Sequence, residues 1–440
     1  MSTSRTLRLE QVIDGAGAVV EVRLGADGSV VNARLAMGGM PRIEHLLVGK
    51  PVVDVPGIVE RLCGICPVAH HLAGIRALEA LYDLPRLTPT ADVLRRLLHH
   101  GAVLQTHAQS LAQVDSFLAR DLNNFARSVV RAAGADSHFP RCAVLGGVRA
   151  PLAVSRRDEL LGDVEQALAR AVAMLGKVES RQRHAAPTLT YDGHEVALVD
   201  ATGALDLYGD RLRAVGSGGA VTIAGARADE WPDLIAESAP GSPASRPYLR
   251  MLGVDAGRYR VGPNAELRAA TSLITPLAET ARQLWLAADG GAIWARAVVA
   301  LHVVEVIEGL LRQPELVDGP VRVEPGDPIR QEASGWVDGA RGLLVHTYRT
   351  NGSGALSGAT ITTPTAQNES WLAGLLGAEL SNNQSVDLLE KLPATLHMAL
   401  EAAVLEADPC LPCSSLPIGQ MRLRLMVVAH DSFGATRERN

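Results

Sequence analysis

Cys63-Gly64-Ile65-Cys66 and Cys410-Leu411-Pro412-Cys413 are two C-x-x-C pairs near opposite ends of the chain. More than three hundred residues separate them. Each pair holds two sulfurs close enough to bind one metal ion or to form one disulfide. Four thiolates together suit one shared soft-metal centre. If the pairs share a centre, the first quarter of the chain must meet its C-terminal end.

Composition excludes several classes of protein. The chain has 440 residues, 47% of them hydrophobic and 20% charged, so it can bury a sizeable core in one to three domains. Its net charge of −6 and the lack of a basic stripe argue against a nucleic-acid partner. Aromatic residues make up only 3%. Because Ala, Leu, Val and Gly dominate instead, we expect a mainly helical protein with close helix contacts.

Cysteine usage and the chain's start indicate a reducing compartment. No apolar run reaches the ~18 to 20 residues needed to span a bilayer, and the opening MSTSRTLRLEQ does not read as a signal peptide. We therefore expect a cytoplasmic protein without a membrane span. Only Cys142 lies outside the pairs. In a reducing compartment a C-x-x-C pair is read as metal-binding or catalytic rather than as a structural disulfide.

Hydrophobic periodicity predicts helices and short strands. Apolar residues at three- and four-residue spacing predict a helix after Cys66, and Pro67 suits its first position. Further helices are predicted over 91–132 (one long helix or a broken pair), 157–180, 277–313 with a break near Gly290, and 386–406. Hairpins are predicted over 19–35 and 343–364, a final strand over 421–428, a connecting loop with short helical pieces over 36–60, and a β- and loop-rich layer over 186–263.

Helix geometry gives the first pair an electrostatic context. Cys66 would stand at the N-terminus of its helix, where the helix dipole and unpaired N–H groups stabilise a thiolate. His70 follows four residues later, so it projects from the same helix face and can donate a hydrogen bond to that sulfur.

Two other kinds of site also use C-x-x-C pairs. A structural zinc site also uses four thiolates, but its pairs usually stand about 15 to 20 residues apart. A thioredoxin-like redox pair would need a local βαβ unit, which the flanking sequence lacks.

Two segments resemble signature motifs of the large, catalytic subunit of nickel–iron hydrogenases: 61–71 (RLCGICPVAHH) and 408–413 (DPCLPC). Their forms are most similar to the soluble cytoplasmic branch that couples to nicotinamide or deazaflavin cofactors. Other stretches resemble family segments: Ser137-His138 with Gly146-Gly147-Val148, Tyr259–Pro263, Gln331–Gly335, Arg341-Gly342 and Thr363–Asn368.

The resemblance implies a separate role for each sulfur. Cys63 and Cys410 would be terminal nickel ligands, whereas Cys66 and Cys413 would bridge nickel to an iron that carries CO and cyanide. Thiolates are soft ligands that suit both metals. Cys410 is the implied base for the proton released from dihydrogen, and His70 would support the Cys66 sulfur from outside the metal's own ligands.

Further residues match family positions around the metals. Arg341 resembles an arginine over the open metal position, although before a predicted hairpin it also fits a surface arginine. Pro364 and Thr365 match the segment around an iron diatomic ligand, and also fit an ordinary strand end. Glu10 resembles a proton-gating glutamate, and Glu44 stands at the position of a glutamate that helps to bind magnesium.

Several departures from the family pattern bear on that site. Leu416 stands where the family has a histidine that binds the magnesium ion and ends the matured chain, so the implied magnesium site would lack one of its usual ligands. Residues 417–440 form the kind of tail that a maturation protease removes, but the Leu416–Pro417 bond resists many proteases. Asp338 and Ala340 replace the usual Glu and Pro, and Pro41-Arg42 replaces Arg-Gly. For the family's aspartate over the metals, the nearest matches are Asp115 and Asp121.

The resemblance implies a mainly α fold with small peripheral β-sheets, its metal site buried between N- and C-terminal segments. Its expected activity is reversible heterolytic cleavage of dihydrogen, with electrons passed to an iron–sulfur small subunit and further NAD(P)- or deazaflavin-linked subunits. A divergent hydrogen sensor or inactive subunit is the alternative. We expect one domain over 1–440, comprising a hairpin and loop region (1–60), a helical region (61–185), a β/loop-rich insertion (186–263), a helical region with a hairpin (264–416) and the tail (417–440).

Overall fold

A computed structural model shows a mainly helical protein with small sheets, as predicted. It describes residues 17–25, 29–36, 44–84, 86–135, 139–182, 191–240, 242, 244–326, 329–351, 354–383, 393–411, 418–430 and 436–439. Contacts divide the chain into two compact units. Unit 1 draws on residues 1–42, 237–248 and 365–440, and unit 2 on residues 43–236 and 249–364. The prediction of a single domain stays a prediction.

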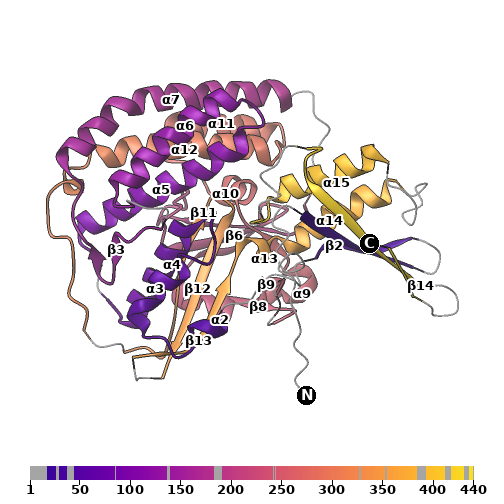
Figure 1. The fold of residues 1–440 in the computed structure, drawn as a ribbon, viewed down its shortest axis with the longest axis horizontal. Helices are drawn as coiled ribbons and strands as arrows, with labels where there is room; N and C mark the ends of the chain where they lie inside the picture. Colours follow the sequence, from indigo (N-terminus) through magenta and orange to yellow (C-terminus); the bar gives the residue numbers. More distant parts are fainter. Residues whose placement is uncertain are drawn as a thin grey trace, which may run out of the picture. The chain divides into compact units, whose positions relative to one another are not determined.

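Unit 2 contains the main helical layer, visible in Figure 1 as α5, α6, α7 and α12 side by side. Helix α12 is apolar on nearly every face and is buried against α5 and α7. The chain starts α5 with a Thr88 cap, whose hydroxyl accepts from the Ala91 N–H, followed by Pro89. The longer helices are α4 Pro67–Leu81, α5 Pro89–Leu111, α6 Ser116–Ala132, α7 Val154–Gln182, α11 Pro276–Ala287 and α12 Ala292–Leu311. The shorter ones are α2 Glu44–Leu47, α3 Val55–Val59, α8 Trp231–Leu234, α9 Gly253–Ala256 and α10 Pro263–Ala269, with 3-10 turns η1 Val52–Asp54, η2 Ala228–Glu230, η3 Arg250–Leu252 and η4 Pro314–Leu316.

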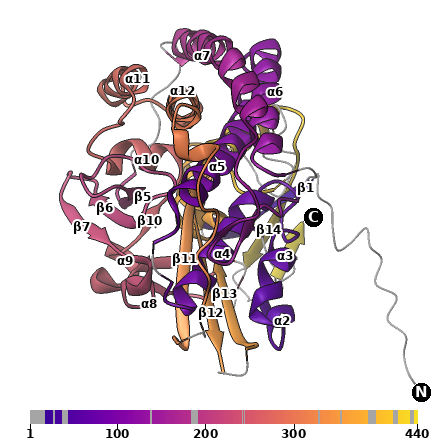
Figure 2. The ribbon, with the colours of Figure 1, turned by 90° about the vertical axis from the view of Figure 1, so that its left-hand side faces the viewer.

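A three-stranded antiparallel sheet stands beside α4 (Figure 2). It consists of β11 Glu332–Gly339, β12 Gly342–Thr350 and β13 Leu356–Thr362. Gly335 lets β11 approach the helix closely, because an added Cβ there would lie 2.1 Å from the Ala77 nitrogen. The close contact fixes α4, and with it the first cysteine pair, on the sheet.

A second sheet of unit 2 falls in the β- and loop-rich layer predicted for 186–263. Its strand order is β10-β5-β6-β7, and Trp231 and Trp336 meet edge-to-face in the apolar cluster beneath it. The strands are β5 His194–Val199, β6 Arg211–Gly216, β7 Val221–Ala226 and β10 Tyr259–Arg260. Two two-stranded sheets complete the set: β3 Ala143–Val144 with β4 Gly147–Val148, and β8 Ile235–Glu237 with β9 Pro247–Leu249.

Unit 1 joins the first strands of the chain to its last. Strand β1 pairs in parallel with β14 along its whole length and antiparallel with β2. The sheet order is β15-β14-β1-β2, and α14 packs on β2 and on α15. The elements are β1 Gly17–Leu24, β2 Val30–Leu35, α14 Glu369–Ser381, α15 Ala394–Ala407, β14 Arg422–His430 and β15 Thr436–Arg439; α13 Pro364–Gln367 begins at the border with unit 2.

Most predicted elements are confirmed. Both hairpins form, the helix after Cys66 starts at Pro67, and 91–132 is a broken pair that divides at 112–115. The longest elements that were not predicted are α14 and β11. Both are largely buried and lack clear periodicity: α14 is apolar on most faces, and β11 is buried along nearly its whole length. Within the described ranges, no helix is long and apolar enough to cross a membrane.

Candidate metal centre

The first cysteine pair forms a compact group of metal-ligating atoms with His70. One ligand atom from each of Cys63, Cys66 and His70 lies within 4.8 Å of the other two. Cys66 is the N-cap residue of α4, as predicted, so its sulfur stands at the positive end of the helix dipole. The Ile65 N–H points at the Cys63 sulfur at 3.4 Å. These features favour thiolates, the form in which cysteine binds metals.

His70 is itself held by a buried hydrogen-bond chain that crosses from α4 to β12. Its Nδ1 lies 3.0 Å from Nε2 of His346, and Nδ1 of His346 lies 2.7 Å from the Tyr348 hydroxyl. Burial lowers the pKa of His346 well below its usual range and raises that of Tyr348. The middle ring is therefore neutral.

Because the His346 ring is neutral, hydrogen bonds along the series Tyr348, His346 and His70 can run in either of two directions. In one, the tyrosine hydroxyl donates to His346, His346 donates to His70, and Nε2 of His70 keeps its hydrogen. In the other, Nε2 of His70 carries a lone pair. A thiolate beside His70 selects the first direction, because it needs a donor. In that direction, the hydrogen on Nε2 of His70 is left available to a neighbouring acceptor.

A buried contact between a histidine and a carboxyl group connects the two sides of the loop that carries the cysteines. Nδ1 of His71 lies 3.2 Å from Glu60 Oε2, and both side chains are almost fully buried. The other ring nitrogen of His71 lies 3.2 Å from the Ala143 carbonyl oxygen. Glu60 closes α3 just before the first cysteine, and His71 lies on α4 just after the second. The pair therefore ties both ends of the cysteine loop together.

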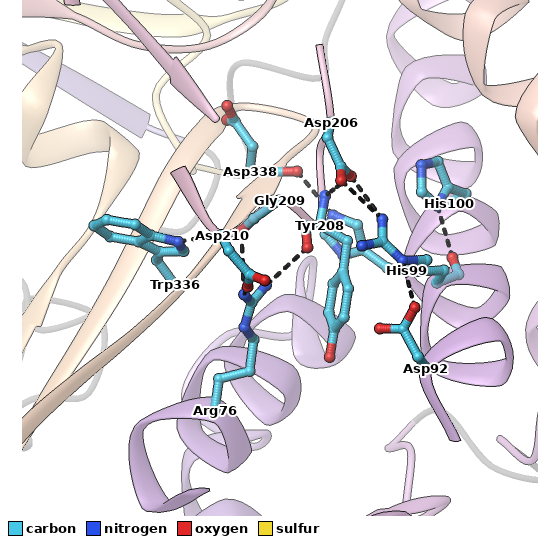
Figure 3. Close-up of polar contacts among 11 residues, drawn as sticks. Arg76, Asp92, His99, His100, Asp206, Tyr208, Gly209, Asp210, Trp336 and Asp338 are labelled. Carbon is cyan, nitrogen blue, oxygen red and sulfur yellow. Dashed lines mark hydrogen bonds and ion pairs between the residues drawn. The ribbon is translucent and has the colours of Figure 1, made fainter. Parts of the chain in front are cut away.

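A wider polar network anchors α4 and α5 to β11 (Figure 3). Arg76 of α4 donates to the carbonyl oxygens of Tyr208 and Gly209, and Trp336 of β11 donates to Gly209 as well. Further contacts join Arg76 to Asp210, Arg96 to both Asp92 and Asp206, His100 to the Arg96 carbonyl, and His99 to the Asp338 carbonyl. The 206–210 segment thus connects both helices to β11.

Arg341 lies in the turn between β11 and β12 and is 8% exposed. It is therefore not a surface arginine. Its carbonyl oxygen packs against Gly262, where an added Cβ would come within 2.8 Å of that oxygen. Two residues earlier, an added Cβ at Gly339 would meet the Ala69 Cβ at 3.7 Å. Because Ala69 belongs to the first turn of α4, the Arg341 turn lies beside the cysteine end of that helix.

The second cysteine pair belongs to unit 1. Helix α15 ends at Asp408, which takes a left-handed conformation with φ 43°, and the chain then reaches Cys410. The Cys410 N–H donates to Oγ1 of Thr365 at 2.8 Å. The structure thus brings together two residues predicted for the site, and Thr365 fixes the backbone that presents the Cys410 sulfur.

The remaining predicted residues lie on α2, α13 and α6 or outside the described residues. Glu44 opens α2, and Pro364 opens α13. Asp115 caps α6 and pairs with Lys177, while Asp121 pairs with Arg170; both therefore have roles in the packing of α6 on α7. Glu10, Pro41-Arg42, Ser137-His138, Cys413 and Leu416 lie outside the described residues.

The sequence motifs did not point to His346, Tyr348 or the Glu60–His71 pair. His346 and Tyr348 are two residues apart in a predicted strand, so their side chains share one face. Two polar side chains on the face of an otherwise apolar run were a usable signal. The Glu60–His71 pair carried none, because its members come from a loop and a helix whose relative placement depends on the fold.

Comparison with known proteins defines the family. The nickel-dependent hydrogenase family description matches residues 42–114, which include the first cysteine pair. The HoxS subunit beta of the NAD-reducing hydrogenase of Cupriavidus necator is 28% identical over 98% of both chains. A crystal structure of an NAD+-reducing nickel–iron hydrogenase matches 89% of this chain and 95% of that one, at 30% identity and a TM-score of 0.81. A nickel–iron–selenium hydrogenase from Dm. baculatum shares the fold alone, at 17% identity and a TM-score of 0.63.

The chain belongs to the nickel–iron hydrogenase large-subunit family. This is a family of oxidoreductases that act on dihydrogen and contain nickel and iron. The donors of the described site fit such a centre, since soft thiolates at a helix N-terminus with a hydrogen-bonded histidine beside them suit nickel and iron better than hard ions.

Proposed function

We propose that this chain is the catalytic large subunit of a hydrogenase that cleaves dihydrogen reversibly into two protons and two electrons. One observation carries the proposal: Cys63 and Cys66 meet at the N-terminus of α4 with His70 beside them. When bound, a nickel–iron centre supplies the site at which dihydrogen is polarised and split heterolytically. The protein supplies ligands, orientation and a route for the proton.

Each cysteine has its own place in this proposal. Cys63 and Cys410 would hold nickel as terminal ligands, and Cys66 and Cys413 would bridge nickel and iron. The Cys410 sulfur would take the proton released from dihydrogen, since thiolates are bases. Its backbone is already fixed by the hydrogen bond to Thr365.

Other side chains would tune and surround the centre. His70 would donate from Nε2 to the Cys66 sulfur, which stabilises the thiolate and lowers its tendency to take a proton. Arg341 would orient dihydrogen or the thiolate base with a guanidinium that stays charged at any relevant pH. Thr365 accepts from Cys410 and keeps its own hydrogen for donation to a cyanide ligand of iron, beside Pro364.

Further elements of the proposal concern the iron ligands, the hard ion and the exit of protons. The iron would carry CO and cyanide. Glu44 would contribute to a magnesium site, which lacks the usual histidine because Leu416 stands there. Glu10 would pass protons away from Cys410.

Electrons must leave through other subunits. The chain has five cysteines, and four are assigned to the active centre, so it has no ligands for an iron–sulfur relay. We propose an iron–sulfur small subunit as the direct partner and NAD(P)- or deazaflavin-linked subunits beyond it, in a cytoplasmic complex. Similarity to the NAD-reducing hydrogenases supports this assembly.

We propose that the tail either stays attached or is cut at a bond other than Leu416–Pro417. The bond that would be cut after Leu416 precedes Pro417, whose missing N–H hinders many proteases. Intact-mass measurement of the metal-loaded protein tests this. Loss of residues 417–440 alone would contradict it.

Dihydrogen-driven reduction of a dye by the purified complex tests the activity. We expect reduction by the wild type, none with Cys410→Ser, and nearly full activity with Cys142→Ala. Cys142 is a suitable control because burial raises the pKa of its thiol to about 11 and it belongs to the helical core. A matured, nickel-loaded wild type that binds dihydrogen without reducing the dye would favour a sensor.

A further inference from the structure

Two carboxyl groups face each other in the core of unit 2. Glu266 of α10 is 1% exposed and Asp338 of β11 is fully buried, and their carboxyl groups lie close enough to affect each other's charge. Oδ2 of Asp338 accepts from the Leu198 N–H at 3.0 Å. Among the described residues, no N–H or other donor group reaches either oxygen of Glu266 or Oδ1 of Asp338.

Such a pair must contain a proton. Two ionised carboxylates in contact repel each other, and burial removes the water that would screen them. A hydrogen bond between two carboxyl groups also needs a hydrogen from one of them. Burial raises the pKa of Glu266 well above its usual range, and the Asp338 charge raises it further. Burial also raises the pKa of Asp338, to about 7.

The groups around the pair do not neutralise it fully. Arg296 of α12 lowers the pKa of Glu266, but less than burial and Asp338 raise it. His99 of α5 donates to the Asp338 carbonyl, and burial lowers the pKa of His99 to about 3, so that ring stays neutral. One shared proton with a net charge of −1 is the state that fits these neighbours.

The pair lies at the end of the sheet nearest the cysteines. Asp338 immediately precedes Gly339, which packs against Ala69 in the first turn of α4. Three residues after Asp338 comes Arg341, in the turn proposed to face the metals. The ring of His99 and the 206–210 network hold this stretch of β11 in place (Figure 3).

We propose that Glu266 and Asp338 form a buried proton-sharing pair that takes up and returns the proton of the dihydrogen reaction. Cleavage of one dihydrogen releases protons at the cysteine end of α4. The pair takes one of them, which turns its shared-proton anion into two neutral acids, and then gives it to water. Charge and protons balance, and no oxidant is involved in this step. The inference rests on the proposed function for its source of protons.

Infrared spectroscopy tests the shared proton independently of metal or activity. We expect the folded protein at pH 7 to show a carbonyl stretch of a protonated carboxylic acid that shifts in D2O. The double variant Glu266→Gln/Asp338→Asn should lose it. Glu159→Gln should keep it, because Glu159 is exposed on α7, where it pairs with Arg156. Absence of the band from the wild type, or its survival in the double variant, would overturn the pairing.

Isotope exchange between dihydrogen and D2O tests the transfer. In metal-loaded protein, Glu266→Gln and Asp338→Asn should each slow exchange by about tenfold or more, while Asp338→Glu restores most of it. Glu159→Gln is again the control. Wild-type exchange rates in both amide variants, with nickel content equal, would overturn the relay. Failure of the proposed function gives a different result: no exchange in matured wild type, with the protonated-acid band still present.

Discussion

Gly335→Ala tests how closely α4 must approach the sheet. An added Cβ would lie 2.1 Å from the Ala77 nitrogen, 2.5 Å from the Arg76 carbonyl carbon and 2.7 Å from the Ala73 oxygen. All three are backbone atoms of one helix, so no side-chain rotation relieves the overlap. Real Cβ atoms essentially never come within 3.0 Å of such atoms, so the helix must move by about 1 Å.

The cost follows from overpacking and from the contacts that the shift breaks. Overpacking in a core usually costs about 1 to 3 kcal/mol, and backbone overlap belongs at the upper end, so we expect a loss of about 3 kcal/mol. The shift also lengthens the 3.0 Å contact between His70 and His346, which joins α4 to β12. A lengthening of about 1 Å takes it beyond hydrogen-bonding distance.

Urea unfolding followed by tryptophan fluorescence measures the stability change, and nickel content of the matured protein reports on the cysteine pair. Gly162→Ala is the matched control, because Gly162 lies within α7 and an added Cβ there meets no atom within 4 Å. That control should stabilise the protein by about 0.5 to 1 kcal/mol. If Gly335→Ala unfolds at the wild-type urea concentration and keeps its nickel, the reasoning about the α4–β11 contact is wrong.

Three further predictions address the buried charges and the second cysteine pair. Arg95→Met should lower the free energy of unfolding in urea by about 3 to 5 kcal/mol. The substitution leaves the largely buried Glu79 carboxylate without the guanidinium that binds both of its oxygens. Adding Glu79→Gln should recover part of the loss. Thr365→Val removes the acceptor of the Cys410 N–H and should lower nickel retention under a chelator, whereas Thr365→Ser should not. Acid should destabilise the protein below pH 6.5, because burial lowers the pKa of His99, His100 and His302 to between about 3 and 4. Urea unfolding at a series of pH values should show a loss of about 2 kcal/mol for each histidine at pH 5. Constant stability between pH 7 and pH 5 would refute this.

Local signals predicted the elements that follow simple rules. The helix after Cys66 has a proline at its first position and a regular apolar spacing, and both hairpins alternate polar and apolar residues. Helix α14 and strand β11 escaped, because each is buried on most sides and shows no clear period. The secondary structure of α14 and β11 depends on the residues that pack against them rather than on a pattern in their own sequence.

The candidate site, too, was predicted only where a local rule applies. Helix geometry placed His70 beside Cys66, since four residues make about one turn. It could not supply His346, which comes from a strand more than two hundred residues away. The Glu266–Asp338 pair shows the limit most clearly: Asp338 was noted only as a departure from the family pattern, and its partner lies on a helix of another segment.

The central claim is that this chain holds a nickel–iron centre between four cysteines. Infrared spectroscopy of the matured, nickel-loaded complex tests it most directly, because CO and cyanide bound to iron absorb where proteins do not. We predict bands of metal-bound CO and cyanide in the wild type and their loss in Cys66→Ser, with Cys142→Ala unchanged. A correctly matured wild type that retains metal but shows no such bands would contradict the account.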